Sequence, residues 1–97
     1  MYALAIVRYR KPIEVIDQLL APHRAYLKSL QEQGLLLASG PLEPRNAGAL
    51  LLRVDDADPL AALDAIRDGD PFVKAGAAQY ELLPWNPVFG KDGLDRL

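Results

Sequence analysis

The sequence contains a single histidine, His23, and its neighbours indicate that this side chain faces inward. Tyr26, Leu27 and Leu30 follow it three, four and seven residues later, a spacing that places all four side chains on one face of a helix. An apolar helical face packs against the protein interior. Histidine has an ordinary pKa close to neutral pH and acts as a general acid or base when a substrate can reach it. His23 is therefore either a hydrogen-bonded core residue or part of a site.

Asp70 is the second residue that could take part in such chemistry. Asp70-Pro71 is typical of a helix start, where the carboxylate caps the N-terminus and contributes about 1 kcal/mol. A carboxylate beside an imidazole also fixes the tautomer of the ring, as a general acid or base requires. Asp70 can serve both purposes if a carboxylate oxygen remains available to His23. Capping alone and capping combined with catalysis both stay open as interpretations.

Other residues have types and positions suited to the lining of a pocket. Ser39 ends a short apolar stretch as either a small residue in a crowded sheet or a hydroxyl donor, and Gly40 would let a ligand approach the backbone. No Gly-x-Ser-x-Gly sequence surrounds Ser39, so it is not expected to be a nucleophile. Pro71 and Phe72 would form a wall and Tyr9 would line the same pocket. Phe72 fits a core position equally well, and Tyr9 fits an aromatic at a strand end.

Hydrophobic periodicity predicts the elements that position these residues. Strands are expected over 2–9, 35–40, 48–54 and 77–83, helices over 13–33 and 59–68, and a helical turn over 71–75. Proline interrupts the helical ladder, so a kink or a new start is expected near Ala21-Pro22. The resulting order, βαββαβ, is typical of the α+β ferredoxin-like fold, a four-stranded antiparallel sheet with helices on one face.

The first strand predicts a partner for the uncovered face of this sheet. Both of its faces are mostly apolar, although two helices can cover only one of them. Tyr2, Leu4 and Ile6 would otherwise belong to a large exposed apolar patch. We therefore expect two copies of the chain to stack sheet on sheet as a twofold homodimer, with a higher oligomer left open.

The length of 97 residues, with 51% hydrophobic and 25% charged residues, indicates one globular domain. We expect a single domain over 1–97, with a core over 1–84 and a tail over 85–97. The tail contains apolar side chains that would anchor it by packing. These candidate anchors are Trp85, Val88 and Phe89.

Charge and composition narrow the classes of partner. A net charge of -2 and a pI near 5.2 give no reason to expect nucleic acid or an anionic membrane. No apolar run approaches the roughly 18 residues of a membrane span, and the N-terminus lacks the basic region of a signal peptide. The absence of cysteine excludes disulfides and suits a cytoplasmic location. With one histidine and no glycine-rich phosphate loop, we expect neither a metal nor another cofactor.

Three stretches of the chain resemble the YCII-related (YciI-like) family of small proteins. They are PHRAYLKSLQEQGLLLASGPL at 22–42, DPFVKAG at 70–76, and the closing strand that runs into Pro84-Trp85. The resemblance implies a ferredoxin-like fold within a dimeric α/β barrel, akin to muconolactone isomerase, and a site built on a histidine–aspartate pair. These positions correspond to His23 and Asp70. Relatives often carry an arginine three residues before the histidine, where this chain has Leu20.

The missing arginine means that Arg24 or Arg8 would have to bind an anion in its place. With this change, the resemblance favours a cofactor-free enzyme in which His23, oriented by Asp70, moves a proton on a small cyclic or phenolic acid. Lyase- or isomerase-type chemistry fits, and family members include a dehydrochlorinase of chlorinated hydroxyquinols. A non-catalytic homodimer that binds a small ligand is the alternative. A cofactor-free monooxygenase or a haem-handling protein is a third interpretation, which the proline beside His23 and the short chain do not favour.

Overall fold

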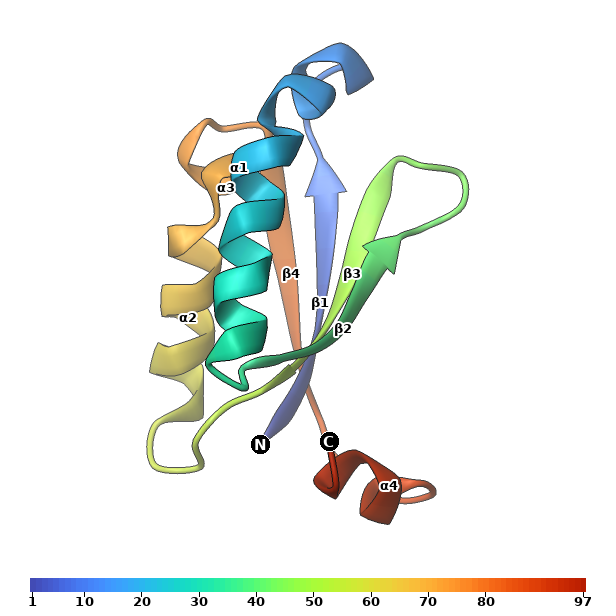
Figure 1. Ribbon diagram of the computed structural model, residues 1–97, viewed down its shortest axis with the longest axis vertical. Coiled ribbons are helices and arrows are strands. Elements are labelled where there is room, and N and C mark those ends of the chain that lie inside the picture. Colours follow the sequence, from blue (N-terminus) through green and yellow to red (C-terminus); the bar gives the residue numbers. More distant parts are fainter.

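The computed structural model describes residues 1–97, and its helices and strands follow the expected order until the closing strand. They are β1 (Tyr2–Tyr9), α1 (Ile13–Glu32), β2 (Leu36–Pro41), β3 (Ala47–Arg53), α2 (Pro59–Gly69), α3 (Pro71–Lys74), β4 (Ala78–Trp85) and α4 (Lys91–Asp95). The strands form one antiparallel sheet in the order β2-β3-β1-β4. Helices α1, α2 and α3 cover one face of it, and α4 lies at the end of the molecule beside the C-terminus (Figure 1). The predicted ferredoxin-like α+β fold is confirmed.

The core lies between the sheet and this helical layer. The central strand β1 contributes Ala3, Ala5 and Val7, whose small side chains let the helices pack close to the sheet. Ile16 and Phe72 are fully buried on the helical side. Burial of each such large apolar side chain stabilises the fold by roughly 1.5–3 kcal/mol.

Helix α1 runs without interruption from Ile13 to Glu32 and contains Pro22. The expected new start near Ala21-Pro22 is therefore wrong, because one helix spans both residues. A proline removes the hydrogen bond to the carbonyl four residues earlier, which belongs to Gln18. Both Gln18 and Pro22 are exposed, so water can satisfy that carbonyl. The helix ends before Gly34, whose φ of 77° favours glycine.

The tail also differs from the expectation. It forms the short helix α4, which is held to the sheet by Tyr2 and Arg53: the Tyr2 hydroxyl donates to Asp95 over 2.6 Å, and the Arg53 guanidinium donates to the Leu97 carbonyl over 2.6 Å. Side chains at Val88 and Phe89 are exposed, Phe89 to 99%, so the prediction that they anchor the tail by packing is wrong for the single chain. No helix is both long enough and apolar enough to cross a membrane.

Candidate active site

The fold brings His23 and Asp70 into contact across 47 residues of sequence. His23 lies near the middle of α1, and Asp70 occupies the junction between α2 and α3. The His23 Nδ1 atom lies 2.9 Å from the Asp70 Oδ1 atom. The histidine side chain is 11% exposed and the aspartate side chain is fully buried. This pair is the contact that the resemblance to the family implies.

Asp70 combines the capping role with the contact to His23. Its Oδ1 atom accepts from the Phe72 backbone N–H over 2.9 Å, which caps α3, and faces His23 at the same time. The Oδ2 atom accepts a hydrogen bond from the Tyr80 hydroxyl. Sequence reasoning required an oxygen kept for His23, whereas the structure shares one oxygen between the cap and the imidazole. All polar atoms of this buried group are satisfied.

Tyr80 is a member of this cluster that sequence reasoning missed. It lies on β4 opposite Val7 of β1, on the face of the sheet that the helices cover. Burial and the Asp70 carboxylate raise the pKa of Tyr80 well above the ordinary value of a phenol, so it remains a donor. The pKa of Tyr26 is raised mainly by burial, and its hydroxyl donates to the Ile66 carbonyl over 2.6 Å. The strand alternation places Tyr80 facing inward and was the available signal.

Asp70 has no lysine or arginine partner, so His23 is the basic side chain that pairs with it. Tyr80 and the backbone N–H of Phe72 are neutral donors. A positive charge that forms on His23 during proton transfer would therefore be balanced by the adjacent carboxylate. When the carboxylate accepts from Nδ1–H, the nitrogen left for a ligand is Nε2.

Phe72 fixes the plane of the imidazole. The two rings stack with centroids 3.9 Å apart and planes within 10° of parallel. The Tyr9 ring packs edge-on against the Phe72 ring, with the two centroids 5.9 Å apart. Because Phe72 is fully buried, the imidazole is held both by a rigid ring and by Asp70.

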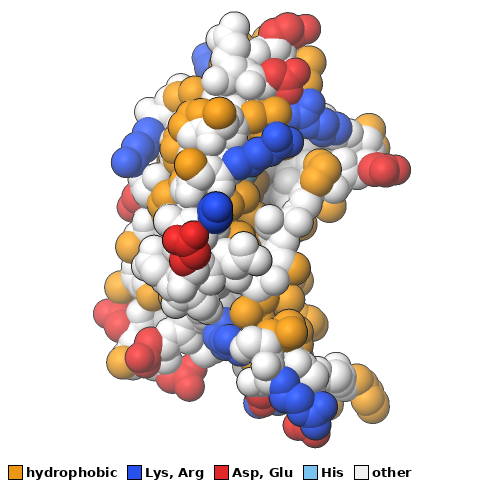
Figure 2. Space-filling model, in the orientation of Figure 1, with side chains coloured by type: hydrophobic (Ala, Val, Ile, Leu, Met, Phe, Trp, Pro, Cys, Tyr) orange, Lys and Arg blue, Asp and Glu red, His pale blue; other side chains and the backbone are white.

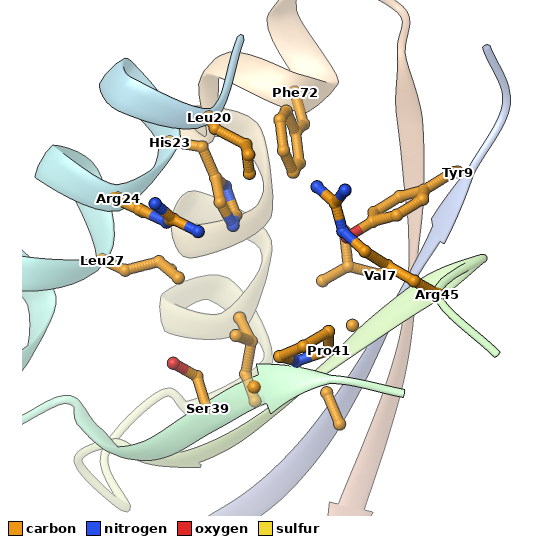
Figure 3. A pocket seen from close by; sticks show the side chains of 14 residues that line it. Val7, Tyr9, Leu20, His23, Arg24, Leu27, Ser39, Pro41, Arg45 and Phe72 are labelled. Atoms are coloured by element: carbon orange, nitrogen blue, oxygen red, sulfur yellow. The ribbon is translucent and has the colours of Figure 1, made fainter. Parts of the chain in front are cut away.

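A cavity of about 260 Å³ lies between α1 and the β1-β3-β2 part of the sheet (Figure 3). An apolar cavity of about 150 Å³ holds benzene, so this volume suits one substituted ring. Five of the predicted residues lie together at its wall: His23, Tyr9, Ser39, Gly40 and Phe72. Other lining residues are Val7, Leu20, Arg24, Leu27, Pro41, Arg45, Gly48, Ala49 and Leu50.

A β-bulge in β2 explains why Ser39 reaches this cavity. Leu36 pairs with Leu52 of β3, but Ser39 pairs with Leu50, so three steps along β2 match two along β3. The extra residue reverses the alternation of β2 and turns Ser39 toward the helices. Sequence alone gave no signal for the bulge.

Two predicted residues lie away from the cavity. Arg8 is on the opposite face of the sheet, where its guanidinium pairs with Glu81 over 2.9 Å. Consecutive strand residues point to opposite faces, so Tyr9 and Arg8 cannot share one pocket. Pro71 occupies the first turn of α3 and is not among the lining residues. The structure therefore does not bring Arg8 or Pro71 to the site.

Two other arginines do line the cavity. Arg24 lies one residue after His23 on α1, and its side chain points across the cavity (Figure 3). Arg45 belongs to the turn between β2 and β3 and extends over the cavity from the opposite side (Figure 3). Sequence reasoning named Arg24 as one replacement for the missing arginine and missed Arg45, because nothing local in a turn segment predicts where a long side chain ends.

The chain was compared with known protein sequences, solved structures and protein families. No curated protein sequence matches the chain. Among solved structures, it is similar to 5-chloro-2-hydroxyhydroquinone dehydrochlorinase from Burkholderia phenoliruptrix in complex with 2,5-dihydroxybenzoquinone, with a TM-score of 0.69 and 21% identity. That match covers 89% of this chain and 95% of the other. The model of the YCII-related domain matches residues 1–86, so the chain belongs to the YCII-related family.

Proposed function

We propose that the protein is an enzyme in which His23, oriented by Asp70, moves a proton on a small cyclic or phenolic acid in a lyase- or isomerase-type reaction. The observation that carries the proposal is the 2.9 Å contact between a buried carboxylate and an imidazole at the wall of a ring-sized cavity. The similar structure supports the same class, because that protein is a dehydrochlorinase solved with a dihydroxybenzoquinone.

The proposed step uses only groups at the site. The Nε2 atom of His23 accepts a proton from a ring hydroxyl or from a carbon next to a carbonyl, and the electron pair of that bond passes into the ring. In a lyase, a leaving group departs from the ring with its bonding electrons as an anion, and His23 later gives its proton to water. In an isomerase, His23 returns the proton to another carbon. The Asp70 carboxylate stabilises the imidazolium in both cases.

Replacement of His23 tests this mechanism. We expect His23→Gln to lower turnover by about 10²–10⁴-fold, the usual contribution of a general acid or base. Purified protein would be incubated with chlorinated and unchlorinated hydroxyhydroquinones, while chloride release and ring C–H exchange with D₂O are followed. Lys28→Gln, an exposed change on the same helix, is the matched control and should retain wild-type turnover. Turnover by His23→Gln at the wild-type rate would contradict the mechanism.

A non-catalytic protein that binds a small acidic ligand is the second candidate. It is supported by the two arginines at the cavity, which anion binding needs and proton transfer does not. The same assay separates the candidates. Wild-type protein that binds members of the panel but neither releases chloride nor exchanges ring protons would favour binding over catalysis.

The homodimer remains part of this proposal. Leu4 and Ile6 of β1 lie on the face of the sheet opposite α1, α2 and α3, together with the partly exposed Leu83 and Trp85 of β4. Tyr2 lies on the same face but is already buried, with its hydroxyl bonded to Asp95 of α4. A second copy stacked on this face would bury the other four side chains. We expect sedimentation velocity to give twice the chain mass of 10.6 kDa, and Leu83→Glu to give monomers. A wild-type chain that sediments as a monomer would contradict the dimer.

A further inference from the structure

The cavity beside His23 carries an excess of positive charge. Its lining contains two guanidinium groups, those of Arg24 and Arg45, and no aspartate or glutamate. The Asp70 carboxylate lies behind His23 and is occupied by its own hydrogen bonds. In the space-filling view, Lys and Arg side chains gather over the upper part of α1 and toward the β2–β3 hairpin (Figure 2). Walls of one charge around a small apolar space favour a ligand of the opposite charge.

Arg45 is held at the rim by a partner that a ligand can replace. Its Nη2 atom lies 2.8 Å from the Asp17 Oδ1 atom of α1, so this pair joins the hairpin turn to the helix. The two side chains are 39% and 51% exposed. Ion pairs at this exposure contribute little to stability, because water competes for both charges. Replacement of the Asp17 carboxylate by that of a ligand therefore costs little free energy of folding.

Arg24 supplies a second positive charge on the other side of the cavity. It forms no ion pair with any carboxylate, and no hydrogen bond of its side chain is present. The close view shows its guanidinium and that of Arg45 pointing into the same space from α1 and from the hairpin (Figure 3). Two planar guanidiniums facing one space suit a single carboxylate, which can accept from both.

We infer that Arg45 determines specificity by binding the acidic group of the substrate, assisted by Arg24, and that Asp17 is the resting partner that Arg45 leaves when the ligand enters. The inference rests on the proposed function, because it assigns the acidic group of the same ligand. It places the ring of the substrate beside His23 and Phe72 and its carboxylate toward the rim.

The test compares two probes that differ in charge but hardly in shape, gentisate and gentisyl alcohol. Their dissociation constants would be measured by titration calorimetry near neutral pH, where gentisate is an anion. We expect the wild-type protein to bind gentisate at least about tenfold more tightly. Arg45→Gln should remove most of this preference. Asp17→Asn should strengthen gentisate binding about two- to fivefold, because a surface pair no longer competes.

Arg67→Gln is the matched control, since it removes another arginine paired with exposed carboxylates, but on α2 and outside the cavity lining. It should keep the wild-type ratio of the two dissociation constants. Equal affinities for the probes in the wild-type protein, no binding of either, or an unchanged ratio in Arg45→Gln would overturn the inference. An Asp17→Asn protein with unchanged or weaker gentisate binding would overturn the role of Asp17.

These measurements are separate from turnover. A His23→Gln protein should keep the preference for gentisate even if it has lost all activity. The proposed chemistry can thus fail while the anion preference stands, and the preference can fail while turnover persists.

Discussion

Two pairs of an acidic and a basic side chain border the cavity, one at its inner wall and one at its rim. In the inner pair, Asp70 is fully buried and accepts from Phe72 and Tyr80 as well as facing His23. In the outer pair, Asp17 and Arg45 are both partly exposed, and the Tyr9 side chain is the other group that acts on the Arg45 guanidinium. The N···O distances, 2.9 Å and 2.8 Å, are almost the same.

Distance alone therefore does not distinguish the two pairs, whereas burial does. Loss of one partner of the inner pair leaves polar groups that water cannot reach, and this is costly. Loss of one partner of the outer pair exposes a charge that water solvates at once. The inner pair is suited to hold a catalytic ring in one orientation, and the outer pair is suited to exchange partners with a ligand.

The largest expected effect is that of Asp70→Ala. This change removes the acceptor of the α3 cap and of Tyr80 and leaves His23 unpaired, so we expect a loss of about 3–5 kcal/mol in the free energy of unfolding. Urea unfolding followed by circular dichroism measures it. Asp64→Ala, an exposed position on α2, is the control and should change stability by less than about 0.5 kcal/mol. If Asp70→Ala also changed the free energy of unfolding by so little, the inner pair would be no more important for stability than the outer pair.

The inner pair was also the part of the site that the sequence predicted best. Periodicity showed that His23 faces inward, but it could not say what His23 meets, because its partner is 47 residues away. The resemblance to the family supplied Asp70. Tyr80 needed one further step, the placement of β4 on β1 with Tyr80 facing the helices, and only that pairing brings its hydroxyl to Asp70.

The outer pair was beyond sequence reasoning. Arg45 lies in a turn, and its contact with Asp17 depends on how far the β2–β3 hairpin bends toward α1. The order and types of the main elements followed from local patterns, as shown by the strands and by the glycine after α1. Two errors have the same origin. A new helix start was expected at Pro22 without knowing that this proline faces water, and packing was expected of Phe89 without knowing which residues it could contact.

A second way to disturb the inner region is Gly69→Ala. An added Cβ would lie 2.5 Å from the Tyr26 hydroxyl oxygen and 2.9 Å from its Cζ atom, closer than atoms can approach. The Tyr26 ring would have to move, and its hydrogen bond to Ile66 would break. We expect a loss of about 1–3 kcal/mol in urea unfolding, although alanine usually stabilises a helix relative to glycine. In a Tyr26→Ala background the same change should be neutral or stabilising.

Tyr80→Phe has an effect of similar size that also depends on pH. It leaves one buried oxygen of Asp70 without its donor, so we expect a loss of about 1–3 kcal/mol near neutral pH. Because burial and Asp70 raise the pKa of Tyr80 in the folded state, its contribution is complete below the unfolded pKa of about 10 and is lost as the pH rises above it. Urea unfolding at about pH 8 and about pH 11 should show a steeper loss for the wild type than for Tyr80→Phe. Parallel losses would mean that Tyr80 does not couple to Asp70 in solution.

The smallest effect is expected for Asp17→Ala, which breaks the outer pair without touching the core. Water replaces Asp17 as the partner of Arg45, so the free energy of unfolding should change by less than about 0.5 kcal/mol. The urea midpoint at low and high salt measures this, with Asp64→Ala on α2 as a control that breaks a similarly exposed arginine pair. A loss above about 2 kcal/mol, absent from Asp64→Ala, would show that the outer pair fixes the hairpin to α1. Arg45 would then be a structural residue, and the contrast between a rigid wall and an exchangeable rim would no longer hold.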